Sequence, residues 1–251
     1  RGRIMDQSRY SLESARACGF EPKLLGLGHT IQNPARHWAR AQARFYVLQD
    51  ALRAHADDDL VLVMDGYDTL FLPHASPALI VERFRHSGAV LMFSSEKAYT
   101  YQWPQYKAQF DQTTTAYRYL AGGTFIGRAW AIRDMVQACI HDMDHGLAGG
   151  NDMGLMGKYA ADHPRRVALD YGRRIFWVTT NDQEHAGQLF DEAVRELGAM
   201  IVHVVAGRRE LSHIYMSMYH QLRAATRPPA SFSLAVRIAG GWIGPLSLSS
   251  N

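Results

Sequence analysis

The chain has 251 residues, of which 47% are hydrophobic and 20% are charged, a composition typical of a soluble globular protein. Its formal net charge of +3 comes from scattered Lys and Arg residues, a pattern that does not indicate nucleic-acid binding. No apolar run approaches the roughly 18 residues that a membrane span requires.

Short β-like runs alternate with amphipathic helical patterns along the chain. The helices are expected at 8–18, 38–55, 76–86, 129–142, 151–161 and 211–225, and the strands at 23–27, 60–64, 89–94, 124–127, 167–169, 174–178 and 200–205. The helix at 76–86 has a clear start, because Ser76 suits the N-cap and Pro77 the first helical position. The alternation predicts an α/β domain with a mostly parallel central sheet flanked by helices.

The composition of the two ends of the chain bears on the domain boundaries. The domain is expected over residues 1–226, and the Pro-, Gly- and Ser-containing stretch 227–251 is expected to pack on it or to lead to a further domain. The start, Arg1-Gly2-Arg3, has neither an initiator Met nor a signal-like apolar region, which indicates a piece of a longer protein and leaves its compartment open. The two cysteines, Cys18 and Cys139, define no disulfide framework, and we expect buried thiols.

Two acids follow the apolar strand LVLVM at 60–64. Asp65 and Asp68 lie three residues apart across a tight turn that Gly66 allows, at the strand end where α/β proteins bind ligands. Such carboxylates can share one hard cation, Mn²⁺ or Mg²⁺, but they can equally cap local turns. Phosphatases of the haloacid-dehalogenase type also place acids after a strand, as Asp-x-Asp; here the spacing is one residue too long for that chemistry.

Several blocks in a specific order extend this interpretation over nearly the whole chain. They are KLLGLG at 23–28, DDLVLVMDGYDTLF at 58–71, VLMFSSE at 90–96, YRYLAGGTFIG at 117–127, NDMGLMGKY at 151–159, VALDYGRRIF at 167–176 and IVHVVAG at 201–207. Together they resemble the glycosyltransferase domain of the procollagen lysyl hydroxylases, and more distantly the collagen galactosyltransferases. The resemblance implies a GT-A fold, which is Rossmann-like and binds a nucleotide sugar.

The resemblance also implies a metal site. The family's D-x-x-D motif and a later histidine carry over to Asp65, Asp68 and His203 as ligands of Mn²⁺ or Mg²⁺. By pattern alone His203, inside the apolar run MIVHVV, is more typical of a core histidine. Tyr67 matches an aromatic position of the family that packs against the nucleotide.

Other residues are expected to contact the donor UDP-sugar. Leu25 and Gly26, at a strand end, approach the nucleotide; Gly207 and Arg209, with Arg208, follow His203 and face the diphosphate, unless the arginines are ordinary surface residues.

Two more acids are candidates for catalysis. Asp152 lies near the transferred sugar by resemblance, although an acid at a helix N-terminus is also explained by capping. Glu96, which ends the run FSSE, is a weaker candidate of the same kind.

One segment departs from the family pattern. Ala121-Gly122-Gly123-Thr124 lacks the family's Asn, although Gly122 and Gly123 still allow a ligand to approach the backbone closely. The family's first strand is also expected to lie before residue 1.

The sequence thus predicts a metal-dependent hexosyltransferase that moves glucose or galactose from a UDP-sugar to a hydroxyl acceptor on a protein or glycan. The alternative is a catalytically inactive relative that serves as a nucleotide-binding or interaction module. The compartment stays open: a cytoplasmic location is slightly favoured, and the secretory-pathway lumen is the alternative that the resemblance implies. The acceptor, the stereochemical outcome and the oligomeric state are not readable from the sequence.

Overall fold

The computed structural model describes residues 2–26, 37–100, 103–146, 152–179, 198–205, 219–220 and 234–237. The helices are α1 Gly2–Ala17, α2 His37–Leu52, α3 Pro77–His86, α4 Pro104–Asp111, α5 Ala129–Asp144 and α6 Asp152–Asp162. The strands are β1 Pro22–Leu25, β2 Leu60–Met64, β3 Thr69–Phe71, β4 Leu91–Glu96, β5 Tyr119–Arg128, β6 Val167–Leu169, β7 Phe176–Val178, β8 Ile201–His203 and β9 Leu234–Arg237. The predicted α/β class is therefore confirmed, and the GT-A fold is consistent with it.

The predicted strand directions need a correction, because the sheets are mixed rather than mostly parallel. The largest sheet has the order β2-β5-β4-β6, in which β5 runs antiparallel to both neighbours and β6 runs parallel to β4. A second sheet has the order β3-β8-β7, with one antiparallel and one parallel pair. Alternation of helices and strands along a sequence reports the order of elements but not their direction, which explains the difference.

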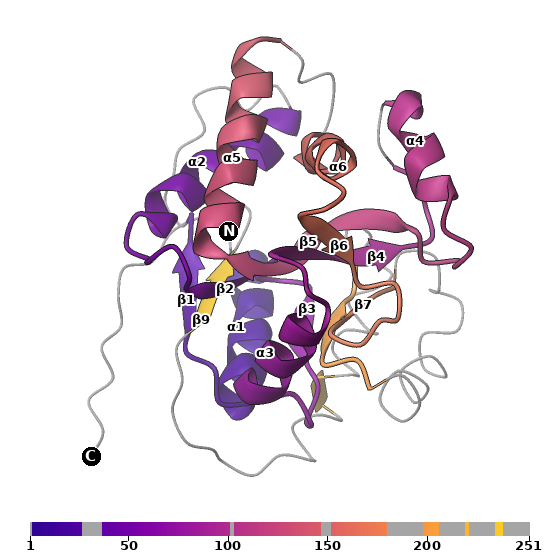
Figure 1. Cartoon of the computed structure of the whole chain (residues 1–251). Helices are drawn as coiled ribbons and strands as arrows, with labels where there is room; N and C mark the ends of the chain where they lie inside the picture. The colour runs from indigo at the N-terminus through magenta and orange to yellow at the C-terminus, as the bar shows by residue number, and fades with distance from the viewer. Residues whose placement is uncertain are drawn as a thin grey trace.

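Helices lie on both sides of the four-stranded sheet (Figure 1). A hydrophobic core covers each face of this sheet. Val61, Val63 and Phe125 face the core that is closed by α2, α5 and α6. Leu62 and Met64 face the other core, which α1, α3 and the second sheet close. Consecutive residues of β2 thus alternate between two apolar cores, and this is why the run LVLVM contains no polar residue.

Several local predictions are confirmed by the structure. The Ser76 hydroxyl accepts a hydrogen bond from the Leu79 amide, so it caps α3 as its sequence position indicated. Cys18 and Cys139 are buried and free. Among the described helices, none combines the length and the apolar character needed to cross a membrane.

Three of the described elements were not predicted, β3, α4 and β9. The predicted helix at 211–225 lies outside the described residues except for 219–220, which are helical. Within the expected C-terminal extension, β9 pairs in parallel with β1.

Candidate metal and sugar-nucleotide site

Three strand ends bring Asp65, Asp68 and His203 together. Asp65 directly follows β2, and its amide donates a hydrogen bond to the Gly123 carbonyl of β5 over 2.8 Å. Asp68 directly precedes β3, which pairs with β8 in a register that sets Thr69 opposite His203. A further backbone bond, from the Val204 amide to the Asp68 carbonyl, holds the two segments at 2.8 Å. The pairing of β3 with β8 therefore places His203, which is distant in the sequence, beside the acidic turn.

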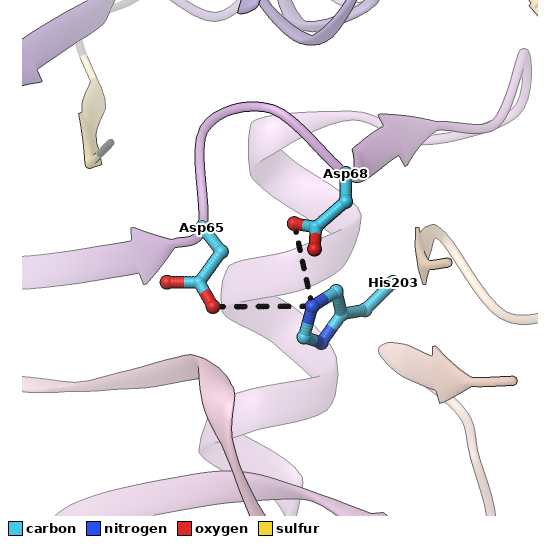
Figure 2. Close-up of side chains that lie close together, drawn as sticks. All are labelled: Asp65, Asp68 and His203. Carbon is cyan, nitrogen blue, oxygen red and sulfur yellow. Dashed lines mark ion pairs between the residues drawn. The ribbon is translucent and has the colours of Figure 1, made fainter. Parts of the chain in front are cut away.

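Figure 2 shows both carboxylates directed toward one edge of the imidazole ring. The Nε2 atom of His203 lies 3.4 Å from Oδ1 of Asp68 and 3.9 Å from Oδ2 of Asp65. One ligand atom from each side chain lies within 4.8 Å of the other two. Asp68 and His203 are buried, whereas the Asp65 side chain is 19% exposed. This set of two carboxylates and one imidazole has the donors and the spacing that fit one divalent cation.

Gly123 provides the space in which these side chains meet. A Cβ atom on Gly123 would lie 2.1 Å from Cε1 of His203 and 2.9 Å from Oδ2 of Asp65, which is too close for either contact. A Cβ atom on Gly122, on the opposite face of β5, would lie 2.4 Å from Cε of Met156 in α6. The two glycines thus permit close packing of protein side chains on both faces of β5.

Arg44 of α2 joins the acids of the site to one another. Its buried guanidinium forms an ion pair with Asp152, approaches Oδ1 of Asp65 to 3.8 Å and donates a hydrogen bond to the Gly122 carbonyl over 2.7 Å. Sequence reasoning missed Arg44, although a signal was present. It lies four residues before Leu48, so a charged side chain falls on the apolar face of a helix, where it needs a buried partner.

The electrostatics of the site favour a bound cation. Burial raises the pKa of Asp65 to about 6; the Arg44 guanidinium opposes this rise, and the Asp68 carboxylate adds to it. Burial alone would lower the pKa of His203, but the neighbouring Asp68 and Asp65 carboxylates reverse the effect and raise it. An added positive charge would favour the ionised carboxylates that burial and mutual repulsion disfavour.

The remaining predicted acids lie around this group. Asp152 is the first residue of α6 and is buried. It forms an ion pair with Arg44, which also approaches Asp65. Glu96 ends β4, is also buried, and its carboxylate contributes to the raised pKa of His203. Tyr67 lies between the two acids of the turn, and the Asp68 carboxylate together with burial raises its pKa well above the usual range.

The predicted nucleotide contacts are more scattered. Leu25 ends β1, and its side chain belongs to the core beside α2 and α5. Gly26 follows it with a φ of 84°, a left-handed conformation that glycine adopts readily. Gly207, Arg208 and Arg209 lie outside the described residues.

Comparison with known proteins gives consistent matches. The family model described as PLOD GT domain matches residues 4–147. Multifunctional procollagen lysine hydroxylase and glycosyltransferase LH3 of Homo sapiens is 30% identical over 132 residues, which cover 50% of this chain and 17% of that protein. Procollagen-lysine,2-oxoglutarate 5-dioxygenase 1 of Gallus gallus is 28% identical over 136 residues, 52% of this chain and 18% of that protein. The human protein of the latter name is 27% identical over 169 residues, 65% of this chain and 22% of its own length. The matched part therefore spans about a fifth of these relatives.

Proposed function

The chain belongs to the PLOD GT domain family, and on this premise we propose that it is a metal-dependent glycosyltransferase. The proposed reaction transfers a hexose, glucose or galactose, from a UDP-sugar to a hydroxyl acceptor. One observation carries the proposal: Asp65, Asp68 and His203 form a group with the donor atoms and spacing that suit Mn²⁺ or Mg²⁺. One relative, LH3, is also named as a glycosyltransferase.

The chemistry of sugar transfer explains why such a group is useful. A divalent cation bound there supplies positive charge to the diphosphate that departs when the sugar–phosphate bond breaks. The protein holds Asp65, Asp68 and His203 in position through the β3–β8 ladder and through the hydrogen bond between the Asp65 amide and β5. The metal-ligand atoms are thus in position before the UDP-sugar binds, so these side chains need little reorganisation during the reaction.

Asp152 and Glu96 are the proposed sugar-side residues. The ion pair with the Arg44 guanidinium orients the Asp152 carboxylate, and in this proposal Asp152 accepts hydrogen bonds from hydroxyl groups of the transferred sugar. Glu96, at the end of β4, is the residue proposed to act on the acceptor hydroxyl. The absence of the family's Asn from Ala121-Gly122-Gly123-Thr124 removes one contact to the sugar and is expected to alter the preference for the hexose.

Five residues are proposed for the nucleotide and the diphosphate. Tyr67 packs on the base or ribose, the β1 end at Leu25 and Gly26 approaches the nucleotide, and Gly207 and Arg209 face the diphosphate.

Release of UDP from UDP-glucose and from UDP-galactose, with Mn²⁺ or with EDTA, tests the proposal. The expected result is metal-dependent release that Asp68→Ala abolishes. The matched control is Asp50→Ala, which removes an exposed acid of α2 that pairs with Arg53 and is expected to leave the activity unchanged. Absence of release from either donor by the wild type, with UDP binding still measurable by calorimetry, would favour the inactive relative.

A further inference from the structure

The strand β1 pairs with a segment that is far from it in the sequence. β9 runs parallel to β1, in a register that extends from Pro22 opposite Leu234 to Leu25 opposite Arg237. Among the described strands, β9 is the one that forms a ladder with β1. Part of the C-terminal stretch is therefore an element of the domain.

β9 also contacts the four-stranded sheet. It touches β2 as well as β1, and Figure 1 shows β9, in yellow, beside both strands. Because neighbouring strands lie about 4.8 Å apart, a strand between β1 and β2 holds them roughly 10 Å from each other. β9 thus extends the layer of the four-stranded sheet as far as β1.

β1 and β2 contribute side chains to the same hydrophobic core. Leu25 of β1 is buried in the core that also contains Val61 and Val63 of β2. Backbone amides and carbonyls next to such a core need hydrogen-bond partners. β9 supplies these partners along one side of β1, so its loss would leave backbone groups of β1 unpaired beside apolar side chains.

The same chain has the length to supply this strand. The Tyr219 ring packs on the Tyr10 ring of α1 with centres 4.3 Å apart, and α1 in turn contacts β1. Residues 221–233 connect this point to β9, and an extended chain spans about 3.3 Å per residue. A chain that has already reached α1 can therefore reach β1, which favours β9 from the same chain over a strand exchanged between two copies.

β9 contacts two strands that border the proposed donor site. β1 ends at Leu25, and Gly26 follows with a φ of 84°, so the chain changes direction where the ladder with β9 ends. β2 ends at Met64 and is followed directly by Asp65 of the metal-ligand group. The lateral distance between these two strands is set by the backbone of β9.

We propose that β9 is a positioning element for the UDP part of the donor. It holds β1 at the distance from β2 at which Leu25 and Gly26 contact the nucleoside of a UDP whose diphosphate lies at the cation of Asp65. This inference rests on the proposed transferase function. It assigns to β9 a role in nucleotide binding and none in metal binding, because the metal-ligand residues lie between β2 and β3 and on β8.

Proline substitutions in β9 of the full chain test this role. Ala235→Pro and Val236→Pro each remove one amide, and successive amides of a strand point to opposite sides, so one of the two variants loses a donor directed to β1. Calorimetry should show that this variant binds Mn²⁺ within about twofold of wild type but binds UDP, with Mn²⁺ present, about tenfold or more weakly. The control Val236→Thr keeps the amide and a β-branched side chain, and it should bind both ligands as the wild type does. Thermal melting confirms that each variant is folded.

A disulfide tests the position of β9 even if a proline variant does not fold. Leu24 and Val236 are register partners, and the roughly 5 Å between paired strands suits a disulfide. Oxidation of the double variant Leu24→Cys with Val236→Cys should link the two positions within one chain, as peptide mass spectrometry would show, and the linked protein should bind UDP as tightly as the wild type. The two single variants control for linkage to Cys18 or Cys139.

The outcomes separate this inference from the proposed function. UDP affinity within about twofold of wild type in both proline variants would overturn the inference and leave the proposed function intact. An equal loss of Mn²⁺ and UDP affinity in a folded proline variant, a disulfide between two chains, or no disulfide would also overturn it. A wild type that binds Mn²⁺ but not UDP would overturn both, because β9 would then have no nucleotide to position. Weaker UDP binding with unchanged Mn²⁺ affinity would support the inference even if neither UDP-hexose is turned over.

Discussion

Replacement of Gly123 by alanine tests how closely the metal-ligand group is fitted to β5. The new methyl group would lie 2.1 Å from Cε1 and 2.6 Å from Nδ1 of His203, and 2.9 Å from Oδ2 of Asp65. The imidazole ring would have to retreat by roughly 1 Å or more to restore ordinary contact, whereas metal–ligand distances tolerate deviations of only about 0.2 Å.

The size of the effect follows from the cost of overpacking. His203 is buried, so retreat of its ring displaces other core atoms, at a cost of about 1–3 kcal/mol. Because about 1.4 kcal/mol corresponds to a tenfold change in affinity, Gly123→Ala should weaken Mn²⁺ binding by roughly 10- to 100-fold. Gly123 does not have a left-handed φ, so alanine adopts its backbone conformation without strain and the steric contact dominates.

The assay is calorimetric titration of Mn²⁺ into folded protein, and Gly122→Ala is the matched control. Its methyl group would meet Cε of Met156, the mobile end of a flexible side chain on the opposite face of β5. Because Met156 is also buried, the control is expected to lose a similar amount of stability, about 1–3 kcal/mol from overpacking the core, but to bind Mn²⁺ as the wild type does. Wild-type Mn²⁺ affinity in a folded Gly123→Ala variant would refute the steric reasoning.

Three further predictions concern charge. Arg44→Met removes the buried partner of Asp152 and should cost roughly 3–5 kcal/mol in urea denaturation, with Arg44→Lys intermediate; a loss below about 1 kcal/mol would contradict the ion-pair network. Because the pKa of Asp65 is about 6 and that of His203 is raised, protons compete with the cation at both ligands, so Mn²⁺ affinity should fall at least about tenfold per pH unit below pH 6; equal affinities at pH 5 and pH 7.5 would argue against these ligands. Asp170→Asn should lower the free energy of unfolding by about 1–3 kcal/mol, because its carboxylate accepts three amide hydrogen bonds, and an unchanged urea midpoint would show that those bonds contribute little.

Local chemistry made much of the fold predictable. The run LVLVM had to be a strand buried on both faces, and Ser76-Pro77 had to begin a helix. The strand β3 was missed because it spans only Thr69–Phe71, directly after the acidic turn. The helix α4 was missed because, despite Pro104 at its start, it buries a single side chain, Phe110, and has no apolar stripe.

The site was predictable to different degrees from residue to residue. The spacing of Asp65 and Asp68 after a buried strand was a direct signal, whereas His203 was assigned only through the family resemblance, because its approach depends on the β3–β8 pairing. Arg44 was missed because Phe45, Leu48 and Leu52 by themselves define an apolar face on this helix, and these three residues give no sign of a buried charge. The glycine pair indicated a close approach to the backbone, but sequence alone could not distinguish a bound ligand from the side chain of His203.

A crystal structure of the chain soaked with Mn²⁺ and UDP, with data collected at the manganese absorption edge, would show whether Asp65, Asp68 and His203 bind the metal. We expect one anomalous difference peak in contact with the carboxylates of Asp65 and Asp68 and with Nε2 of His203, and the UDP diphosphate on its open side. Bound UDP without a peak at these three side chains, or a peak elsewhere on the chain, would rule out the proposed metal site.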